Sequence, residues 1–175
     1  MFSYNNVGSS ASSKLKEDSS CANNTRNQAN GRFINGNQVA SHSFPWVVRI
    51  GEGKCNVFCG GALIKNNIVL TTAHCQTEDM KFVTIGDHDC MQMDDDEIQI
   101  KIKQWIGHQY FFIPRNKKYA LNDISIVVLE RKVEYSRNVM PLCLPRKNDH
   151  YNLTNMAADV AGWGDHGVDE TRDTD

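Results

Sequence analysis

The chain has 175 residues, a formal net charge of −2 and 40% hydrophobic residues, which fits one globular unit with an ordinary core. The balanced charge gives no reason to expect a nucleic-acid partner. No apolar run approaches the roughly 18 residues that a membrane-spanning helix needs, so we expect no membrane partner either.

Residues 1–32 are rich in Ser, Asn and Lys and poor in large apolar side chains. Such a composition cannot bury enough apolar surface to offset the entropy that is lost on ordering. We therefore expect a flexible leader over this range. The stretch from Met1 to Asn6 has neither the basic start nor the apolar core of a signal peptide. The sequence thus predicts that the natural beginning lies further upstream.

From Phe44 onward the sequence has a β pattern. Residues 98–102 alternate strictly between apolar and polar side chains, which is typical of a strand with one buried face. Lys65-Asn66-Asn67 separates two apolar runs, and Asn tolerates the positive φ that a tight hairpin needs. Short strands with turn signals between them predict an all-β barrel or sandwich. The six expected strands cover residues 47–50, 62–64, 68–70, 82–85, 98–102 and 124–129, and residues 157–163 are expected to form one further strand.

The cysteines are even in number, which favours disulfides and an extracellular location. They are Cys21, Cys55, Cys59, Cys75, Cys90 and Cys143. Free thiols, a zinc site or a redox site are the competing interpretation. Zinc sites favour tight cysteine pairs, and Cys55 and Cys59 are the only close pair. Two glycosylation motifs, at Asn23 and Asn152, also fit a secreted protein, although such triplets are common by chance.

Two short segments carry residues that fit nucleophilic catalysis. His74, in Thr72-Ala73-His74-Cys75, is a candidate general base, because a serine hydroxyl is a weak nucleophile until an imidazole removes its proton. Asp123, just before an apolar strand, is a candidate carboxylate that orients the imidazole. A structural histidine and a turn-capping aspartate are the alternatives.

Several further segments occur in the order found in trypsin-like (chymotrypsin-family) serine proteases, which this sequence resembles. The His-before-Asp order is also that of this family. The Gly-Asp-Ser-Gly-Gly segment that carries the family's nucleophile does not occur. The matching segments are Phe33-Ile34-Asn35-Gly36, Pro45-Trp46, Cys59-Gly60-Gly61, Thr72-Ala73-His74-Cys75, Asn122-Asp123-Ile124, Pro141-Leu142-Cys143-Leu144-Pro145 and Ala161-Gly162-Trp163-Gly164.

The resemblance implies an all-β, double-barrel fold. Residues 33–156 would form a first six-stranded antiparallel barrel that carries His74 and Asp123, and residues 157–175 would begin an incomplete second barrel. The serines after Asp123 are Ser125, in a strand-like run, and Ser136, in a charged loop. Neither is in a setting typical of a nucleophile, so we expect the chain as given to be inactive.

The resemblance also selects disulfide partners. It implies Cys59–Cys75, which ties the histidine loop to the neighbouring strand, and Cys21–Cys143, which links the leader to the body. Cys55–Cys90 is then the remaining pair.

In addition, Arg32-Phe33 resembles a zymogen activation site that an upstream trypsin-like protease would cleave. The α-amino group freed at Phe33 could then pair with a buried carboxylate. Phe33 departs from the small β-branched residue that is usual in the family at this position. The larger side chain works against efficient insertion of the freed N-terminus beside its carboxylate partner. An exposed arginine in a loop is the alternative.

An acidic loop runs from Asp87 to Glu97. Calcium takes about 6–8 oxygen ligands, and carboxylates at both ends of a loop could supply some of them. Some relatives bind calcium in the matching loop, and Asp87 and Glu97 lie near the matching positions. The alternative is a solvated acidic loop without an ion. Triad chemistry itself requires no cofactor.

The resemblance therefore predicts the N-terminal part of a secreted serine endopeptidase zymogen, with protein substrates and protease inhibitors as partners. The alternative is a non-catalytic serine-protease homologue that acts as a binding or regulatory protein. Retention of both His74 and Asp123 favours the enzyme, because a decoy has no need of them.

Overall fold

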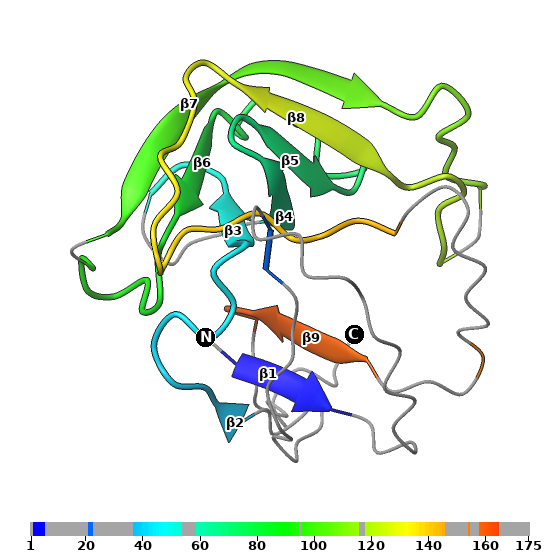
Figure 1. Ribbon diagram of the computed structural model, residues 1–175. Helices are drawn as coiled ribbons and strands as arrows, with labels where there is room; N and C mark the ends of the chain where they lie inside the picture. The colour runs from blue at the N-terminus through cyan, green and yellow to red at the C-terminus, as the bar shows by residue number, and fades with distance from the viewer. Residues whose placement is uncertain are drawn as a thin grey trace.

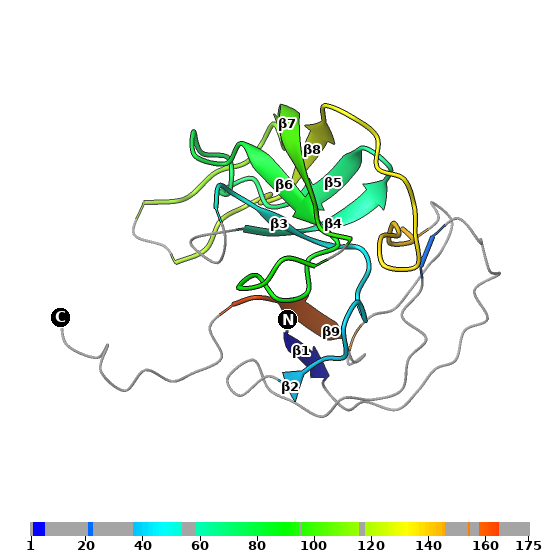
Figure 2. The same ribbon diagram turned by 90° about the vertical axis from the view of Figure 1, so that its left-hand side faces the viewer.

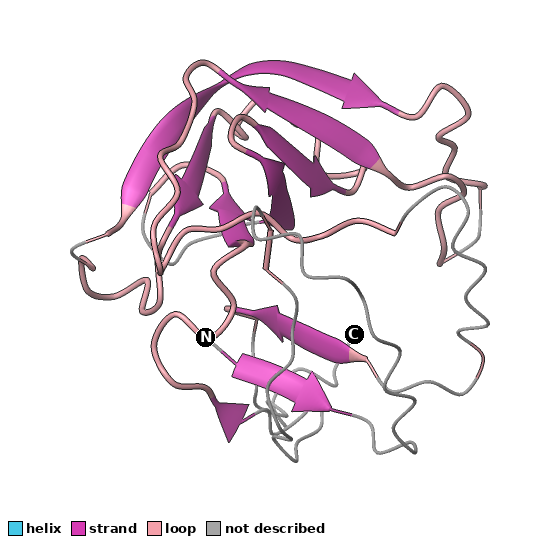
Figure 3. Ribbon diagram, viewed as in Figure 1, coloured by secondary structure: helices cyan, strands magenta, loops and turns pink. Residues whose placement is uncertain are grey.

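The structure is a computed structural model that describes nine strands over eight stretches of the chain. The stretches are residues 2–5, 21–22, 37–53, 59–94, 96–115, 118–145, 154 and 158–164. The strands are β1 (Phe2–Asn5), β2 (Asn37–Gln38), β3 (Val47–Ile50), β4 (Cys59–Lys65), β5 (Ile68–Thr71), β6 (Phe82–Ile85), β7 (Ile98–Gly107), β8 (Ser125–Leu129) and β9 (Asp159–Gly162). None of these stretches forms a helix, so none contains one that could cross a membrane (Figure 3).

Six of the strands close into an antiparallel barrel in the order β3-β4-β5-β8-β7-β6 (Figure 1). The predicted all-β barrel of six strands is confirmed. The long strand β7 pairs with β6 through its first half and with β8 through its second half. A bulge between Ile102 and Gln104 lies where β7 passes from one neighbour to the other. Closure leaves the barrel without the unpaired edges that an open sheet would expose.

The barrel interior is filled by branched aliphatic side chains. They come from every barrel strand and from the segment that follows β8, and most are completely buried. The members are Val48, Ile50, Leu63, Val69, Val83, Ile85, Ile100, Val127, Leu129, Val133 and Val139. In β7, Ile100 is buried while Gln99 and Lys101 are exposed, as the alternating pattern predicted.

The β4–β5 hairpin forms where Lys65-Asn66-Asn67 predicted it, with a two-residue turn at Asn66 and Asn67. The expected positive φ at this turn is wrong, because among the described non-glycine residues only His42 and Asn122 have a positive φ. A register shift between Leu63 and Lys65 occurs in the same hairpin. We infer that this bulge supplies the local twist that a left-handed turn would otherwise provide.

A second, three-stranded sheet has the order β2-β1-β9 and lies beside the barrel (Figures 1 and 2). Strand β1 pairs antiparallel with β9, from Phe2 opposite Gly162 to Asn5 opposite Asp159. The flexible leader expected over residues 1–32 therefore needs correction at residues 2–5, which are a strand here. Pairing with a strand distant in sequence supplies hydrogen-bond partners that leader composition alone does not reveal.

The leader is also joined to the body at Cys21 and Ala22. Cys21 forms a disulfide with Cys143. The Ala22 amide donates to the Pro141 carbonyl at 2.7 Å, and the Cys143 amide donates to the Ala22 carbonyl at 3.3 Å. These contacts hold the leader next to the segment that leaves the barrel.

Candidate active site

The pairing of β5 with β8 brings His74 and Asp123 to one end of the barrel. Thr71, the last residue of β5, lies opposite Ser125, the first residue of β8. Because the two strands are antiparallel, the chain after Thr71 and the chain before Ser125 leave the sheet at the same end. His74 and Asp123 are therefore adjacent in space although they are 49 residues apart in sequence.

Both oxygens of the Asp123 carboxylate accept hydrogen bonds from His74. The backbone amide of His74 donates to Oδ1 at 2.8 Å. The ring nitrogen Nδ1 lies 2.6 Å from Oδ2. One carboxylate thus restrains the position of the residue and the rotation of its ring at the same time.

This arrangement determines which ring nitrogen is basic. An ionised carboxylate can only accept hydrogen bonds, so Nδ1 of His74 carries a proton and Nε2 of the neutral ring has a free lone pair. The hydrogen bond from His74 lowers the pKa of Asp123 from its ordinary value, which keeps this carboxylate ionised. The His74 side chain is 53% exposed, so an approaching group can reach the imidazole ring. The pair can act as a general base with an orienting carboxylate.

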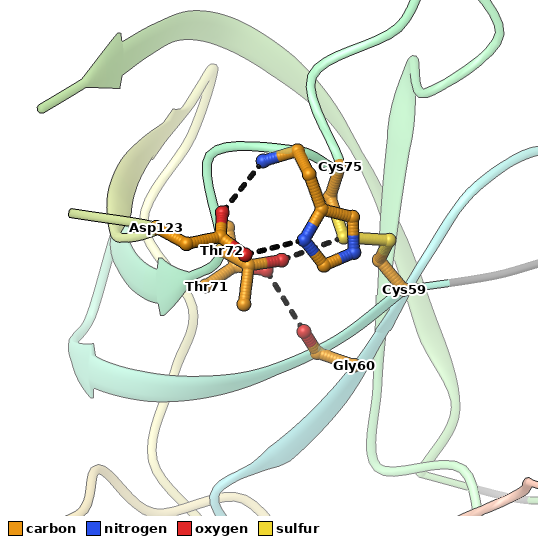
Figure 4. Close-up of a disulfide and its surroundings, with 7 residues drawn as sticks. Cys59, Gly60, Thr71, Thr72, Cys75 and Asp123 are labelled. Carbon is orange, nitrogen blue, oxygen red and sulfur yellow. Dashed lines mark hydrogen bonds and ion pairs between the residues drawn. A yellow bond between two sulfur atoms is a disulfide. The ribbon is translucent and has the colours of Figure 1, made fainter. Parts of the chain in front are cut away.

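A disulfide and two threonines support the loop that carries His74 (Figure 4). Cys75 is bonded to Cys59 at the start of β4. The Thr72 hydroxyl lies 2.8 Å from the Cys75 sulfur, and it is the donor because a disulfide sulfur carries no proton. The Thr71 hydroxyl donates to the Gly60 carbonyl at 2.8 Å. These contacts join the end of β5 to the start of β4 and limit movement of His74.

Asn122 shapes the turn that presents Asp123. It has a φ of 52°, a left-handed conformation that asparagine adopts more readily than most residues. Its side-chain amide donates to the Tyr110 carbonyl at 2.9 Å, and its own carbonyl accepts from the Ile124 amide at 2.8 Å. The turn propensity of Asn-Asp and the orienting role of Asp123 are thus compatible.

No hydroxyl group in the described part of the chain lies within hydrogen-bonding distance of the His74 ring. Ser125 is buried, and its hydroxyl lies 3.2 Å from the Ile106 carbonyl, to which it donates. The Ser136 hydroxyl accepts from the Asn138 amide in an exposed turn. Neither serine after Asp123 is in a position to be activated by His74.

Two cysteine sulfurs and one histidine nitrogen come close together at this site, but they do not form a zinc centre. Cys59, His74 and Cys75 place potential ligand atoms within 4.8 Å of one another. The two sulfurs, however, are bonded to each other and are not the thiolates that zinc needs.

The predicted residues outside this site are placed only in part. The described residue Cys90 is disulfide-bonded, whereas its expected partner Cys55 lies outside the described residues. The activation-site residues Arg32 and Phe33 and the glycosylation residues Asn23 and Asn152 also lie outside them.

Arg49, which belongs to none of the motifs in the sequence, lies between the two candidate calcium ligands. Its guanidinium is 2.7 Å from the Asp87 carboxylate and 3.6 Å from that of Glu97. Burial raises the pKa of Asp87, and the attraction of Arg49 opposes this rise. The sequence did contain a signal for this cluster. Arg49 is a lone cation inside the apolar run Val47–Ile50, and an acidic loop begins 38 residues later at Asp87.

The fold and this His–Asp pair define the barrel of a serine-protease domain, and comparisons with known proteins agree. Residues 33–174 match the protein-family model described as Trypsin, and the chain belongs to this family of trypsin-like serine proteases. The resemblance found in the sequence is thereby confirmed.

Among curated proteins, the chain is 30% identical to the clotting factor G beta subunit of Tachypleus tridentatus, over 94% of this chain and 54% of that protein. It is 34% identical to granzyme M of Rattus norvegicus, over 79% of this chain and 52% of that protein. The solved structure titled "Structure of GrC" aligns with a TM-score of 0.56 and 32% identity, covering 66% of this chain and 50% of that one. The chain spans about half the length of the curated relatives it matches.

Proposed function

We propose that this chain supplies the general base and the orienting carboxylate of a serine endopeptidase that hydrolyses peptide bonds in protein substrates. The observation that carries the proposal is the two-point contact between Asp123 and His74, which leaves the lone pair on Nε2 of a side chain that is 53% exposed. The nucleophilic serine is not among these 175 residues, and we propose that it belongs to the remainder of a longer natural product.

In the proposed reaction, Nε2 of His74 removes the proton of the serine hydroxyl as the oxygen attacks the scissile carbonyl carbon. Asp123 stabilises the imidazolium that forms and does not itself take up the proton. The imidazolium then donates its proton to the leaving amine, which leaves an acyl-enzyme. A water molecule, deprotonated by the same histidine, hydrolyses this ester and restores the serine.

We also propose that the natural product is a secreted zymogen. Disulfides persist in oxidising compartments, and the described residues contain the bonds Cys21–Cys143 and Cys59–Cys75. Cleavage after Arg32 by a trypsin-like protease would free the amino group of Phe33, while Cys21 would keep the leader attached. We propose in addition that this product is glycosylated at Asn23 and Asn152 and that protease inhibitors control it.

The proposal is tested on the complete natural product that contains these residues. Asp123→Asn should lower kcat/KM for a peptide substrate by about 10⁴-fold, because it leaves the ring in the wrong tautomer. His74→Ala should lower it further, by about 10⁶-fold, because it removes the base itself. His108→Ala is the matched control, since His108 is also exposed and its ring accepts from the Tyr110 amide instead. Equal activity of all four proteins would reject the proposed roles.

A second measurement concerns the 175-residue chain itself. We expect that a fluorophosphonate probe, which labels activated serines, does not label it, because no hydroxyl in the described structure contacts His74. Specific labelling that His74→Ala abolishes would contradict this expectation. A complete product that folds, retains both residues and still lacks activity would favour the non-catalytic homologue.

A further inference from the structure

Arg49 is a charged residue in a position that would ordinarily be apolar. It lies on β3 between Val48 and Ile50, which are completely buried, and it is itself only 3% exposed. An unpaired charge at such depth is strongly unfavourable, so an arginine is retained there only with well-placed partners. Those partners indicate what the residue does.

The guanidinium is bound on several sides by oxygen atoms. Nε and Nη2 lie 2.8 and 2.7 Å from the same Asp87 oxygen, Oδ2. Nη1 donates to the Gly53 carbonyl at 2.7 Å. Nη2 also lies 3.6 Å from Oε1 of Glu97 at the far end of the acidic loop. Arg49 thus bridges the beginning and the end of residues 87–97.

Other contacts draw the same loop into a closed shape. Gly86 has a φ of +77°, and a Cβ atom placed there would lie 2.3 Å from the Asp96 carbonyl oxygen, so the two ends of the loop approach closely. The Asp94 carboxylate accepts from the amides of His88 and Asp89 inside the loop. The described residues of the loop are therefore drawn together beside the Arg49 guanidinium.

A calcium ion bound between Asp87 and Glu97, as the sequence predicted, would need the oxygens that Arg49 occupies. Calcium binds carboxylate and carbonyl oxygens at about 2.3–2.6 Å and needs about six to eight of them. The carboxylates of Asp87 and Glu97 and the carbonyl of Gly53 all face the guanidinium at 2.7–3.6 Å. Two cations cannot share this set at contact distance, so the residues present do not fit calcium while Arg49 is in place.

We infer that Arg49 is a built-in counter-ion that holds the loop from Asp87 to Glu97 in place of a calcium ion, so that the chain folds and remains stable without calcium. Among the described residues, the other oxygen of the same carboxylate, Oδ1 of Asp87, is buried and has no hydrogen-bond partner. This oxygen is therefore available to a cation that replaces the guanidinium. Removing the guanidinium should convert the loop into a calcium site.

The first test uses the unmodified chain and two probes, calcium and terbium. Thermal unfolding should give the same Tm in EDTA and in about 10 mM calcium. Terbium, which replaces calcium and emits when a nearby tryptophan is excited, should give no saturable signal. Trp163 is suitably placed, because its Nε1 donates to the His88 carbonyl at 3.1 Å. Calcium-dependent stabilisation, or a terbium signal that calcium displaces and Glu97→Gln abolishes, would overturn the inference.

The second test uses Arg49→Met, which removes the charge and keeps an unbranched apolar stem. We expect a lower Tm in EDTA and a gain of roughly 3–5 °C in about 10 mM calcium, for a site with a Kd of about 1 mM. Lys81→Met is the matched control, because it removes a cation from an exposed pair with Glu52. It should show no calcium response.

A folded Arg49→Met chain that gains nothing from calcium would contradict the inference. So would an equal calcium response in Lys81→Met, since that would show a nonspecific effect. If Arg49→Met does not fold even in calcium, the measurements on the unmodified chain still decide the question.

Discussion

Replacing both Cys59 and Cys75 with alanine should lower the free energy of unfolding by about 4 kcal/mol. The disulfide closes a loop with a sequence separation of 16, and the chain-entropy model gives about 3 kcal/mol for a loop of that length. Cys75 is buried, so loss of its sulfur adds about 1 kcal/mol of lost packing. The Thr72 hydroxyl also loses its acceptor, which makes the total a lower estimate.

The change is measured by equilibrium unfolding in urea under conditions that leave the other disulfides intact. With a dependence on urea of about 2 kcal/mol per molar, the midpoint should fall by about 2 M. Alanine is preferred to serine because a hydroxyl at the Cys75 position would be a new buried polar group. His74→Ala is the control, since it changes the residue next to Cys75 and leaves the Cys59–Cys75 disulfide in place.

A folded double variant that loses less than about 1 kcal/mol would refute the loop-closure reasoning. That result would mean that the unfolded chain keeps enough contacts within the β4–β5 hairpin to restrict it as much as the disulfide does. A large loss in the His74→Ala control would refute it in another way, because the stability would then depend on the histidine and its bond to Asp123.

Two further predictions concern packing and titration. Gly61→Ala should lower stability by about 1–3 kcal/mol in a thermal melt, because its Cβ would lie 2.8 Å from the Val69 side chain, whereas Gly60→Ala meets no atom within 4 Å and should be tolerated. Asp123→Asn should destabilise the chain at neutral pH. The difference in unfolding free energy between the variant and the unmodified chain should begin to shrink below about pH 3.8. It should disappear as the pH falls through the lowered pKa of Asp123, because protonation then removes the same charge from the unmodified chain. A difference that grows on acidification would show that the carboxylate is not stabilised by His74.

The barrel could be predicted from local sequence because each strand carries its own signal. Residues 98–102 alternate in polarity, so the burial of Ile100 follows from pattern alone. The other runs are short, branched and separated by turn residues, which predicts strands without selecting the buried positions. The conformation of the Asn66-Asn67 turn did not follow, because it depends on the bulge between Leu63 and Lys65 in the same hairpin. Strand β1 did not follow either, because its partner β9 is more than 150 residues distant.

The sequence by itself was sufficient to select His74 and Asp123, because each lies in a short motif whose order along the chain is specific. Only the tertiary structure decided that the Asp123 carboxylate contacts both the backbone and the ring of His74, since this depends on the register of β5 against β8. The role of Arg49 likewise required the fold. An arginine and an acidic loop 38 residues apart reveal their charges in the sequence, but whether one neutralises the other depends on distances that barrel closure alone determines.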